Sequence, residues 1–332
     1  MLIGKNIISL LGIIVVGSAS AQTKNIVQEN LMFDRIDRNY LLQHIAQPLT
    51  PQALANSLDT NEGRKFPLII SLHGGGQKAE DVFKQNNLSQ YAYDNGYYFL
   101  APNAYNGYWN DYRDVSLSGD KISHVDDLAF ILTIINKVSK DIPINQNSVF
   151  ITGFSNGGYL ATTIGCRAIG SVQGIATIGA TLTYKNSSTC INRNLPTLMI
   201  NGEDDLKTPL YGNNQPFINK EQHEITYPPF ETYKNSAMKN GCTEISNLAP
   251  LHPDSSVKYS ESLNCSGYKN IYYQIENMGH IIPNVAAPYI KKHPSLGNPS
   301  NAISSDKLII EYFNNIIQFN KKKSTKEVSK SN

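Results

Sequence analysis

The segment Gly153-Phe154-Ser155-Asn156-Gly157 places a serine between two glycines, a pattern typical of a nucleophile on a sharp strand-to-helix turn. β-prone residues precede it and a small-residue helical pattern follows it. Side chains two positions before and after the serine would collide across such a turn, so both positions require glycine. The pattern therefore predicts that Ser155 attacks an electrophilic carbon and forms a covalent intermediate.

A serine nucleophile needs a histidine to remove its proton. His280 directly follows the apolar segment 270–279, which we expect to be a strand ending at the same sheet edge as Ser155. His223, His252 and His293 lie in polar or proline-flanked segments, which are typical of the surface. We therefore predict His280 as the base.

The base in turn needs a carboxylate that orients its ring. In proteins with a serine on this kind of strand-to-helix turn, the carboxylate lies between the serine and the histidine in chain order. Glu203, Asp204 and Asp205 follow the buried apolar run of "LPTLMINGEDDLKTP". A run of acidic residues in a loop is often only solvated. Its place after a buried strand favours a functional role, and we predict Asp205, with Asp204 as the alternative.

A second glycine-rich turn, His73-Gly74-Gly75-Gly76, ends the apolar run "PLIISL". Glycines there allow backbone N–H groups to approach a developing oxyanion. We predict the N–H of Gly75 as one donor, with Gly74 as the alternative, and the N–H of Asn156 as the other. A plain glycine turn is the competing interpretation. His73 is predicted to support the loop rather than to act as a base.

Apolar runs that alternate with helical patterns must position these residues. The runs lie near 67–72, 97–105, 148–153, 172–180, 195–202 and 270–279, and helices are predicted at 79–96, 126–140, 156–170, 227–241 and 304–323. Such alternation indicates an α/β fold with a mostly parallel central sheet and helices on both faces. With no repeat or linker in the sequence, we expect a single domain over residues 22–320.

The two ends of the chain differ from this pattern. Residues 7–17 form an apolar run of eleven residues, too short to span a bilayer, and small residues at Ala19 and Ala21 follow it. These features predict a signal peptide over 1–21 with cleavage after Ala21, and hence a secreted or periplasmic protein. A retained anchor is the alternative. The lysine-rich segment 321–332 is predicted to be a disordered tail.

The composition excludes several classes of protein. The formal charge of +2 and the lack of a basic, aromatic-rich stripe argue against nucleic-acid binding. No other segment predicts a membrane span, and no cysteine or histidine spacing predicts a metal. We expect no cofactor. In an oxidising compartment the four cysteines pair most simply as Cys166 with Cys190 and Cys242 with Cys265, with other pairings and free thiols still possible.

With these residues identified, the sequence resembles the polyhydroxybutyrate depolymerase-like esterases, an α/β-hydrolase group that includes feruloyl and acetylxylan esterases. The similarity is carried by "PLIISLHGGGQ", "GYWND", "VDDLAFI", "VFITGFSNGGYLA", "LPTLMINGEDDLKTPLYG", "NGC" and "NMGH". It implies Ser155 as nucleophile, Asp205 as acid and His280 as base, and it supports the two disulfide pairings. It also implies a structural role for Asp126 and Asp127.

Some positions depart from the family pattern. Asn201 replaces a usual histidine, Leu210 replaces a usual tyrosine, and Ile281-Ile282-Pro283 replaces a common Thr-Trp-Pro. These positions are expected near the pocket, so no single family substrate transfers to this chain. Trp109 keeps the family pattern and is predicted either to line an acyl pocket or to pack in the core.

The sequence as a whole predicts a secreted serine hydrolase of carboxylic esters, with acyl or feruloyl esters of polysaccharides as the favoured substrates. A hydroxyalkanoate polyester or oligomer is the alternative substrate. A catalytically silent secreted binding protein is the alternative from another class, and an intact serine, histidine and aspartate set argues against it.

Overall fold

The computed structural model describes residues 25–85, 87–113, 125–168, 170–191, 195–212, 226–284 and 295–331. The predicted signal peptide and its cleavage site lie outside these residues, as do His223 and His293. No helix within the described ranges combines the length and apolar character that a membrane crossing needs.

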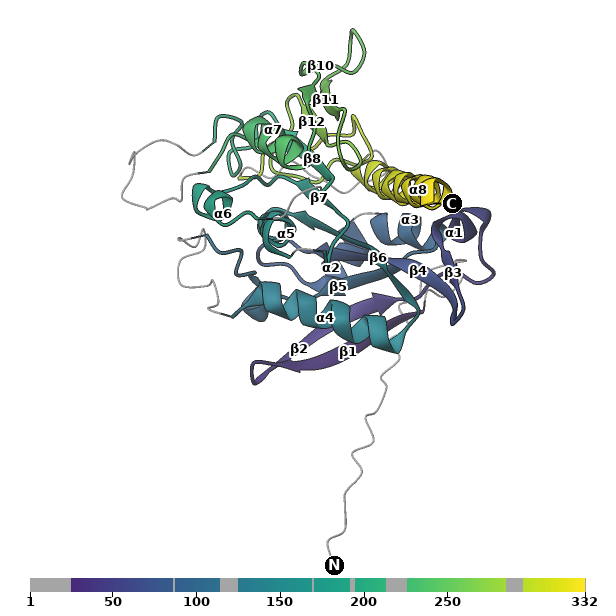
Figure 1. The fold of residues 1–332 in the computed structure, drawn as a ribbon. Helices are drawn as coiled ribbons and strands as arrows, with labels where there is room; N and C mark the ends of the chain where they lie inside the picture. The colour runs from purple at the N-terminus through teal and green to yellow at the C-terminus, as the bar shows by residue number, and fades with distance from the viewer. Residues whose placement is uncertain are drawn as a thin grey trace, which may run out of the picture.

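One sheet of twelve strands dominates the fold (Figure 1), and its main path runs β1-β2-β5-β4-β6-β7-β8-β12-β11-β10. The strands from β5 to β12 along this path pair in parallel, while the pairs at both ends are antiparallel. The strands span Ile26–Phe33 (β1), Ile36–Gln43 (β2), Leu58–Thr60 (β3), Gly63–Leu72 (β4), Tyr98–Pro102 (β5), Ile144–Phe154 (β6), Gly174–Ile178 (β7), Thr197–Gly202 (β8), Glu244–Ile245 (β9), Ala249–Pro250 (β10), Val257–Leu263 (β11) and Ile271–Ile275 (β12). This is the predicted α/β architecture.

Successive residues of the central strands enter two different cores, because side chains alternate across a sheet. In β4, Leu68 and Ile70 pack into one core and Ile69 into the other. In β6, Val149 and Phe150 divide in the same way. Both faces of the parallel sheet are therefore buried, which explains why these strands are almost continuously apolar.

Helices cover the two faces. Those that contribute to the first core are α2 (Ala79–Gln85), α3 (Leu88–Asp94) and α8 (Ser305–Ser331), while α4 (Asp127–Asp141) and α5 (Asn156–Arg167) contribute to the second. The shorter helices are α1 (Pro51–Asn56), the 3₁₀ turn η1 (Tyr105–Gly107) and α6 (Tyr184–Ser188), and α7 (Pro229–Lys239) packs beside β8 and β12. In Figure 1, α8 runs beside α3 and α1, and α4 lies on the opposite side of the sheet.

The structure differs from the sequence-based expectation at three elements. The helix expected over 79–96 is two helices, α2 and α3, and the N–H of Asn87 at the start of α3 donates to Asp306 Oδ2 at 2.9 Å. Strand β11 was not expected from its mixed sequence. Residues 321–331, expected to be a disordered tail, continue α8, and Lys321 Nζ donates to the carbonyls of Ala55 and Ser57 at 2.7 and 2.6 Å.

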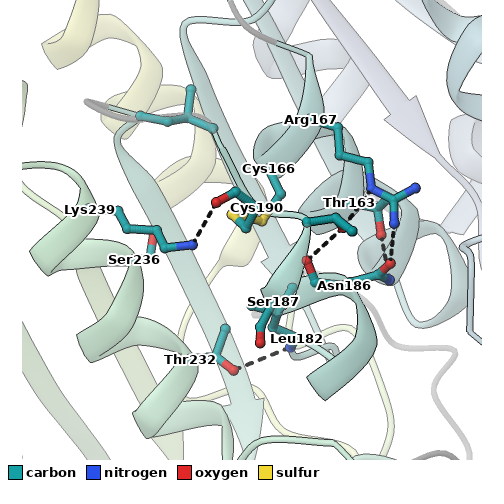
Figure 2. The surroundings of a disulfide bond; sticks show 12 residues. Thr163, Cys166, Arg167, Leu182, Asn186, Ser187, Cys190, Thr232, Ser236 and Lys239 are labelled. Atoms are coloured by element: carbon teal, nitrogen blue, oxygen red, sulfur yellow. Dashed lines mark hydrogen bonds between the residues drawn. A yellow bond between two sulfur atoms is a disulfide. The ribbon is translucent and has the colours of Figure 1, made fainter.

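Both simple cysteine pairings are present as disulfides, Cys166–Cys190 and Cys242–Cys265. Figure 2 shows the first of them, which joins the last turn of α5 to the segment after α6. Lys239 Nζ of α7 donates to the Cys190 carbonyl at 3.0 Å, so the same point also contacts a third helix.

Candidate active site

Ser155 lies on the turn between β6 and α5, at the carboxyl edge of the sheet. Its φ of 53° and ψ of −123° are strained for a residue with a side chain, and such strain persists only where the surroundings hold it. The Ser155 N–H donates to the Ile178 carbonyl of the neighbouring strand at 3.0 Å. The elbow geometry that the sequence predicts is therefore present.

The two glycines of the motif are required by backbone contacts. A Cβ atom on Gly153 would lie 2.3 Å from the Gly157 carbonyl oxygen, which is the predicted collision across the turn. A Cβ atom on Gly157 would lie 2.3 Å from the Leu72 carbonyl oxygen, which belongs to β4. The second glycine thus serves the packing of the elbow against another strand.

The structure brings the predicted serine, histidine and aspartate together. His280 Nε2 lies 2.7 Å from Ser155 Oγ, and His280 Nδ1 lies 2.7 Å from Asp205 Oδ2. His280 and Asp205 are buried, whereas Asp204 and His252 are exposed. Among the three candidate carboxylates, only Asp205 reaches the imidazole; Glu203 instead pairs with Lys258.

Asp205 is held in place by the turn that follows it. Its Oδ1 accepts hydrogen bonds from the backbone N–H groups of Lys207 and Thr208, both at 2.8 Å. The Thr208 hydroxyl donates to the Gly179 carbonyl at 2.9 Å. Oδ1 thus accepts the hydrogen bonds of the turn, while Oδ2 contacts His280.

Backbone hydrogen bonding in the glycine loop distinguishes Gly75 from Gly74. The Gly74 N–H donates to Gln77 Oε1 and the Gly76 N–H donates to the Gly107 carbonyl, both at 2.8 Å. The N–H groups of Gly75 and Asn156 donate to no acceptor among the described residues. Gly75 and Asn156 line the same cleft as Ser155, so the prediction that their N–H groups stabilise an oxyanion is compatible with this hydrogen bonding.

His73 and Trp109 form hydrogen bonds with the backbone at the start of the glycine loop. His73 is buried, its Nδ1 donates to the Gly74 carbonyl at 2.8 Å, and its Nε2 accepts the N–H of Ala104 at 3.1 Å. Burial lowers the pKa of His73 to about 4, so the ring is neutral at physiological pH. Trp109 is fully buried and donates its indole N–H to the His73 carbonyl at 2.9 Å. Trp109 thus packs in the core, one of the two alternatives predicted for it, and is not among the residues that line the cleft at Ser155.

Asn156 also connects the elbow to the loop after Trp109. Its side-chain oxygen accepts the Trp109 N–H at 2.8 Å, and its Nδ2 donates to Asp111 Oδ2 at 2.7 Å. Asp111 in turn binds the Arg113 guanidinium, whose carbon lies 4.0 Å from the centre of the Tyr159 ring. Sequence reasoning missed this network, and only the "GYWND" motif hinted at Asp111.

Asp126 and Asp127 have the structural roles that the family resemblance implies. Asp126 caps α4 by accepting the Ala129 N–H at 2.9 Å. Asp127 is buried, pairs with Arg38 at 2.8 Å and accepts the Asn110 N–H at 2.7 Å.

A cleft of about 280 Å³ opens above Ser155. It is lined by Gly74, Gly75, Gln77, Tyr108, Arg113, Phe154, Ser155, Asn156, Lys207, His280 and Leu296. Asn201 and Leu210, two of the positions that depart from the family pattern, are not among these residues; Asn201 is buried and bonds the Ala180 carbonyl. Over the described ranges, no group of three or more histidine, cysteine or acidic side chains is arranged to hold a metal ion.

A larger hollow of about 910 Å³ lies between α5 and α7, beside the Cys166–Cys190 disulfide. None of the serine, histidine and aspartate residues described above lines it. The smaller cleft is therefore the candidate active site, because Ser155 and His280 line it.

Comparison with known proteins gives matches to a family model and to proteins described as esterases. Residues 57–189 match the family model described as BD-FAE. Two curated relatives, both described as probable feruloyl esterase C, come from Aspergillus niger and Aspergillus terreus and are each 26% identical to this chain. The alignments cover 113 and 123 residues, or 32% and 36% of this chain, and the chain spans 38% and 42% of the relatives' length.

Solved structures show lower identity. A structure described as acetyl xylan esterase from Aspergillus awamori is 12% identical, with a TM-score of 0.49 over 77% of this chain and 95% of that one. A structure described as a thermostable esterase is 19% identical, with a TM-score of 0.42 over 56% of this chain and 48% of that one. The family-model match covers β4, the glycine loop and the elbow. The chain is therefore similar, over the part that carries these elements, to proteins described as feruloyl esterases, and its fold is a mostly parallel α/β sheet.

Proposed function

We propose that this protein is an exported serine esterase that hydrolyses carboxylic esters, with acyl or feruloyl esters of polysaccharides as its substrates. The observation that carries the proposal is the hydrogen-bonded series from Ser155 through His280 to Asp205 at the end of a strained elbow. The similarity to proteins described as probable feruloyl esterases supports the choice of ester.

In the first half of the reaction, Ser155 Oγ attacks the ester carbonyl while His280 Nε2 takes its proton. Asp205 holds the ring so that Nδ1 carries its hydrogen, and it stabilises the imidazolium that forms. The N–H groups of Gly75 and Asn156 stabilise the oxyanion. His280 then protonates the leaving alcohol, and an acyl-enzyme remains on Ser155.

In the second half, water attacks the acyl-enzyme and His280 acts as base again. The acid product leaves and Ser155 regains its proton. The ordered N–H donors lower the barrier in both halves, because both pass through a tetrahedral oxyanion.

Export is part of the proposal. The N-terminal segment has the pattern of a signal peptide, and two disulfides are typical of an oxidising compartment. Secretion with cleavage after Ala21 would be tested by N-terminal sequencing of the exported protein.

The first prediction concerns the nucleophile. Ser155→Ala should lower kcat on a short-chain nitrophenyl ester by about 10³-fold or more, because no other group replaces Oγ. Ser188→Ala, at an exposed serine of α6, is the matched control and should keep full activity. A fluorophosphonate probe should label the parent chain and not Ser155→Ala. Undiminished activity of that variant, or a parent chain inert to the probe, would refute the proposal and favour a silent binding protein.

The natural ester can be identified by rates on methyl ferulate, acetylated xylan and hydroxybutyrate oligomers. The proposal expects the first two to be hydrolysed faster than the oligomers. The reverse order would point to a polyester depolymerase.

A further inference from the structure

The cleft above Ser155 contains two cationic residues and no acidic residue among its lining residues. Arg113 and Lys207 line it, and no aspartate or glutamate does. Asp205 contacts the other side of the His280 ring from Ser155. Such a lining favours a substrate with negative charge.

Arg113 lines the cleft with a side chain that is only 5% exposed and is ordered by its contacts. Its Nε lies 2.9 and 3.0 Å from the two oxygens of Asp111, and its Nη2 lies 2.5 Å from Oδ2. The guanidinium also stacks on Tyr159. A guanidinium ordered in this way loses little further freedom when it binds an anion, because the free-energy cost of ordering has been met by the fold.

Lys207 is exposed and is fixed at its backbone by the bond from its N–H to Asp205 Oδ1. None of the ion pairs among the described residues includes the Lys207 ammonium group. With the fully buried Asp111 balancing Arg113, these three groups leave one positive charge at the cleft.

Tyr159 connects Arg113 to the turn that carries Lys207. The Tyr159 ring contacts Arg113, and its hydroxyl lies 3.4 Å from Thr208 Oγ1, next to Lys207 in the chain. That turn holds Asp205 against His280, the residue that would protonate the leaving alcohol.

We infer that the alcohol part of the natural ester carries a carboxylate, as in an acidic, uronate-bearing saccharide, and that Lys207 and Arg113 bind it. The inference rests on the proposed esterase activity and deepens it. It names the charge of the alcohol part, which neither the family match nor the relatives specify.

The test compares two acetate esters that differ in one charge, those of 4-hydroxybenzoate and 4-hydroxybenzamide. The measured quantity is kcat/KM for the charged 4-hydroxybenzoate ester divided by kcat/KM for the neutral 4-hydroxybenzamide ester. A variant that is less active on both esters to the same degree leaves this ratio unchanged. Lys207→Glu should lower this ratio about tenfold, since it replaces attraction by repulsion near the leaving group. Arg113→Lys should lower it about threefold, because it keeps the charge but loses the ordered fork. Added salt should lower the parent ratio, as expected for partly exposed charges.

Lys322→Glu is the matched control, because Lys322 is an exposed lysine on α8 and does not line the cleft; it should leave the ratio unchanged. A second substrate pair, mono(4-nitrophenyl) succinate and 4-nitrophenyl butyrate, carries the charge on the acyl part. If Lys207→Glu lowers the charged-to-neutral ratio for this second pair and not for the first, the assignment of the charge to the alcohol part is overturned.

A parent enzyme that hydrolyses the neutral esters, with ratios that Lys207→Glu leaves unchanged, would overturn this inference and leave the proposed function intact. A parent chain that hydrolyses none of the four esters would overturn both.

Discussion

At the residue scale, the geometry around Ser155 is set by a few backbone groups. The elbow requires glycine at two positions because a carbonyl oxygen occupies the space of each Cβ. In the neighbouring loop, Gln77 and Gly107 engage the N–H groups of Gly74 and Gly76. The N–H of Gly75, which lines the cleft, donates to no acceptor among the described residues.

The residue-scale prediction concerns the orienting carboxylate. Asp205→Asn should lower kcat on a nitrophenyl ester by about 10³- to 10⁴-fold, because an amide favours the wrong imidazole tautomer. The melting temperature should change little. Asp204→Asn is the matched control at the exposed neighbour and should stay within about twofold of the parent. Equal losses in the two variants would show that Asp205 has no special role.

At the element scale, the start of α8 links three segments around the site. Asp306, in the first turn of α8, is buried, and its Oδ2 accepts the Asn87 N–H at 2.9 Å and Asn284 Nδ2 at 3.0 Å. Asn284 follows His280 by four residues. Burial raises the pKa of Asp306 to about 6, since the loss of hydration outweighs the hydrogen bond from Asn87.

This shift predicts a dependence of stability on pH. A raised pKa means that ionised Asp306 is disfavoured in the fold, so its contribution to stability is present below about pH 4 and is lost as pH rises through 6. Asp306→Asn cannot ionise. It should therefore gain on the order of 2–3 kcal/mol relative to the parent between pH 4 and pH 7.

The measurement is urea unfolding of the parent and Asp306→Asn across this range. The difference between the two proteins is the relevant quantity, because neutral, buried His73 gives the parent curve an opposite slope. Asp254→Asn, at an exposed aspartate, should show no such trend. A difference that stays constant from pH 4 to pH 7 would exclude the proposed titration of Asp306.

At the scale of the whole molecule, the doubly covered sheet and the two disulfides hold distant segments together. The chain order reverses at β4, which pairs with β5 on one side and β6 on the other. Ligand sites of open α/β sheets lie at such points. The glycine loop follows β4 and the elbow follows β6, so Gly75 and Asn156, the proposed oxyanion donors, line one cleft there.

The whole-molecule prediction concerns the disulfides. Replacing Cys166 and Cys190 together by serine should lower the free energy of unfolding by about 3 kcal/mol in the chain-entropy model. The Cys242 and Cys265 pair should cost about the same, because the sequence separations are 24 and 23 residues. Urea unfolding with and without reductant measures both, and reductant should not affect a protein that lacks all four cysteines. Unequal costs would show that packing and not loop length dominates.

Much of the site could be predicted from the sequence because its signals are local. The Gly-x-Ser-x-Gly motif, the apolar runs and the residues that end them are contiguous features, and they led to Ser155, Asp205 and His280. The pattern fails where local signals conflict with tertiary contacts. Asn87 is the N-cap of α3, and its N–H donates to Asp306, more than two hundred residues away. Lys321 is part of α8 and donates to the carbonyls of Ala55 and Ser57.

By itself, the sequence determined the α/β alternation and the types of residue that could do chemistry, since backbone periodicity and turn geometry depend on near neighbours. Only the tertiary structure gave the Gly74 N–H an acceptor in Gln77, buried Trp109 in the core, and brought Arg113 and Lys207 to the lining of one cleft. These outcomes depend on which donors and charges meet across the fold, and His280 and Ser155 are 125 residues apart in the chain. Hydrogen-bond competition and burial act through space, and no spacing along the chain encodes them.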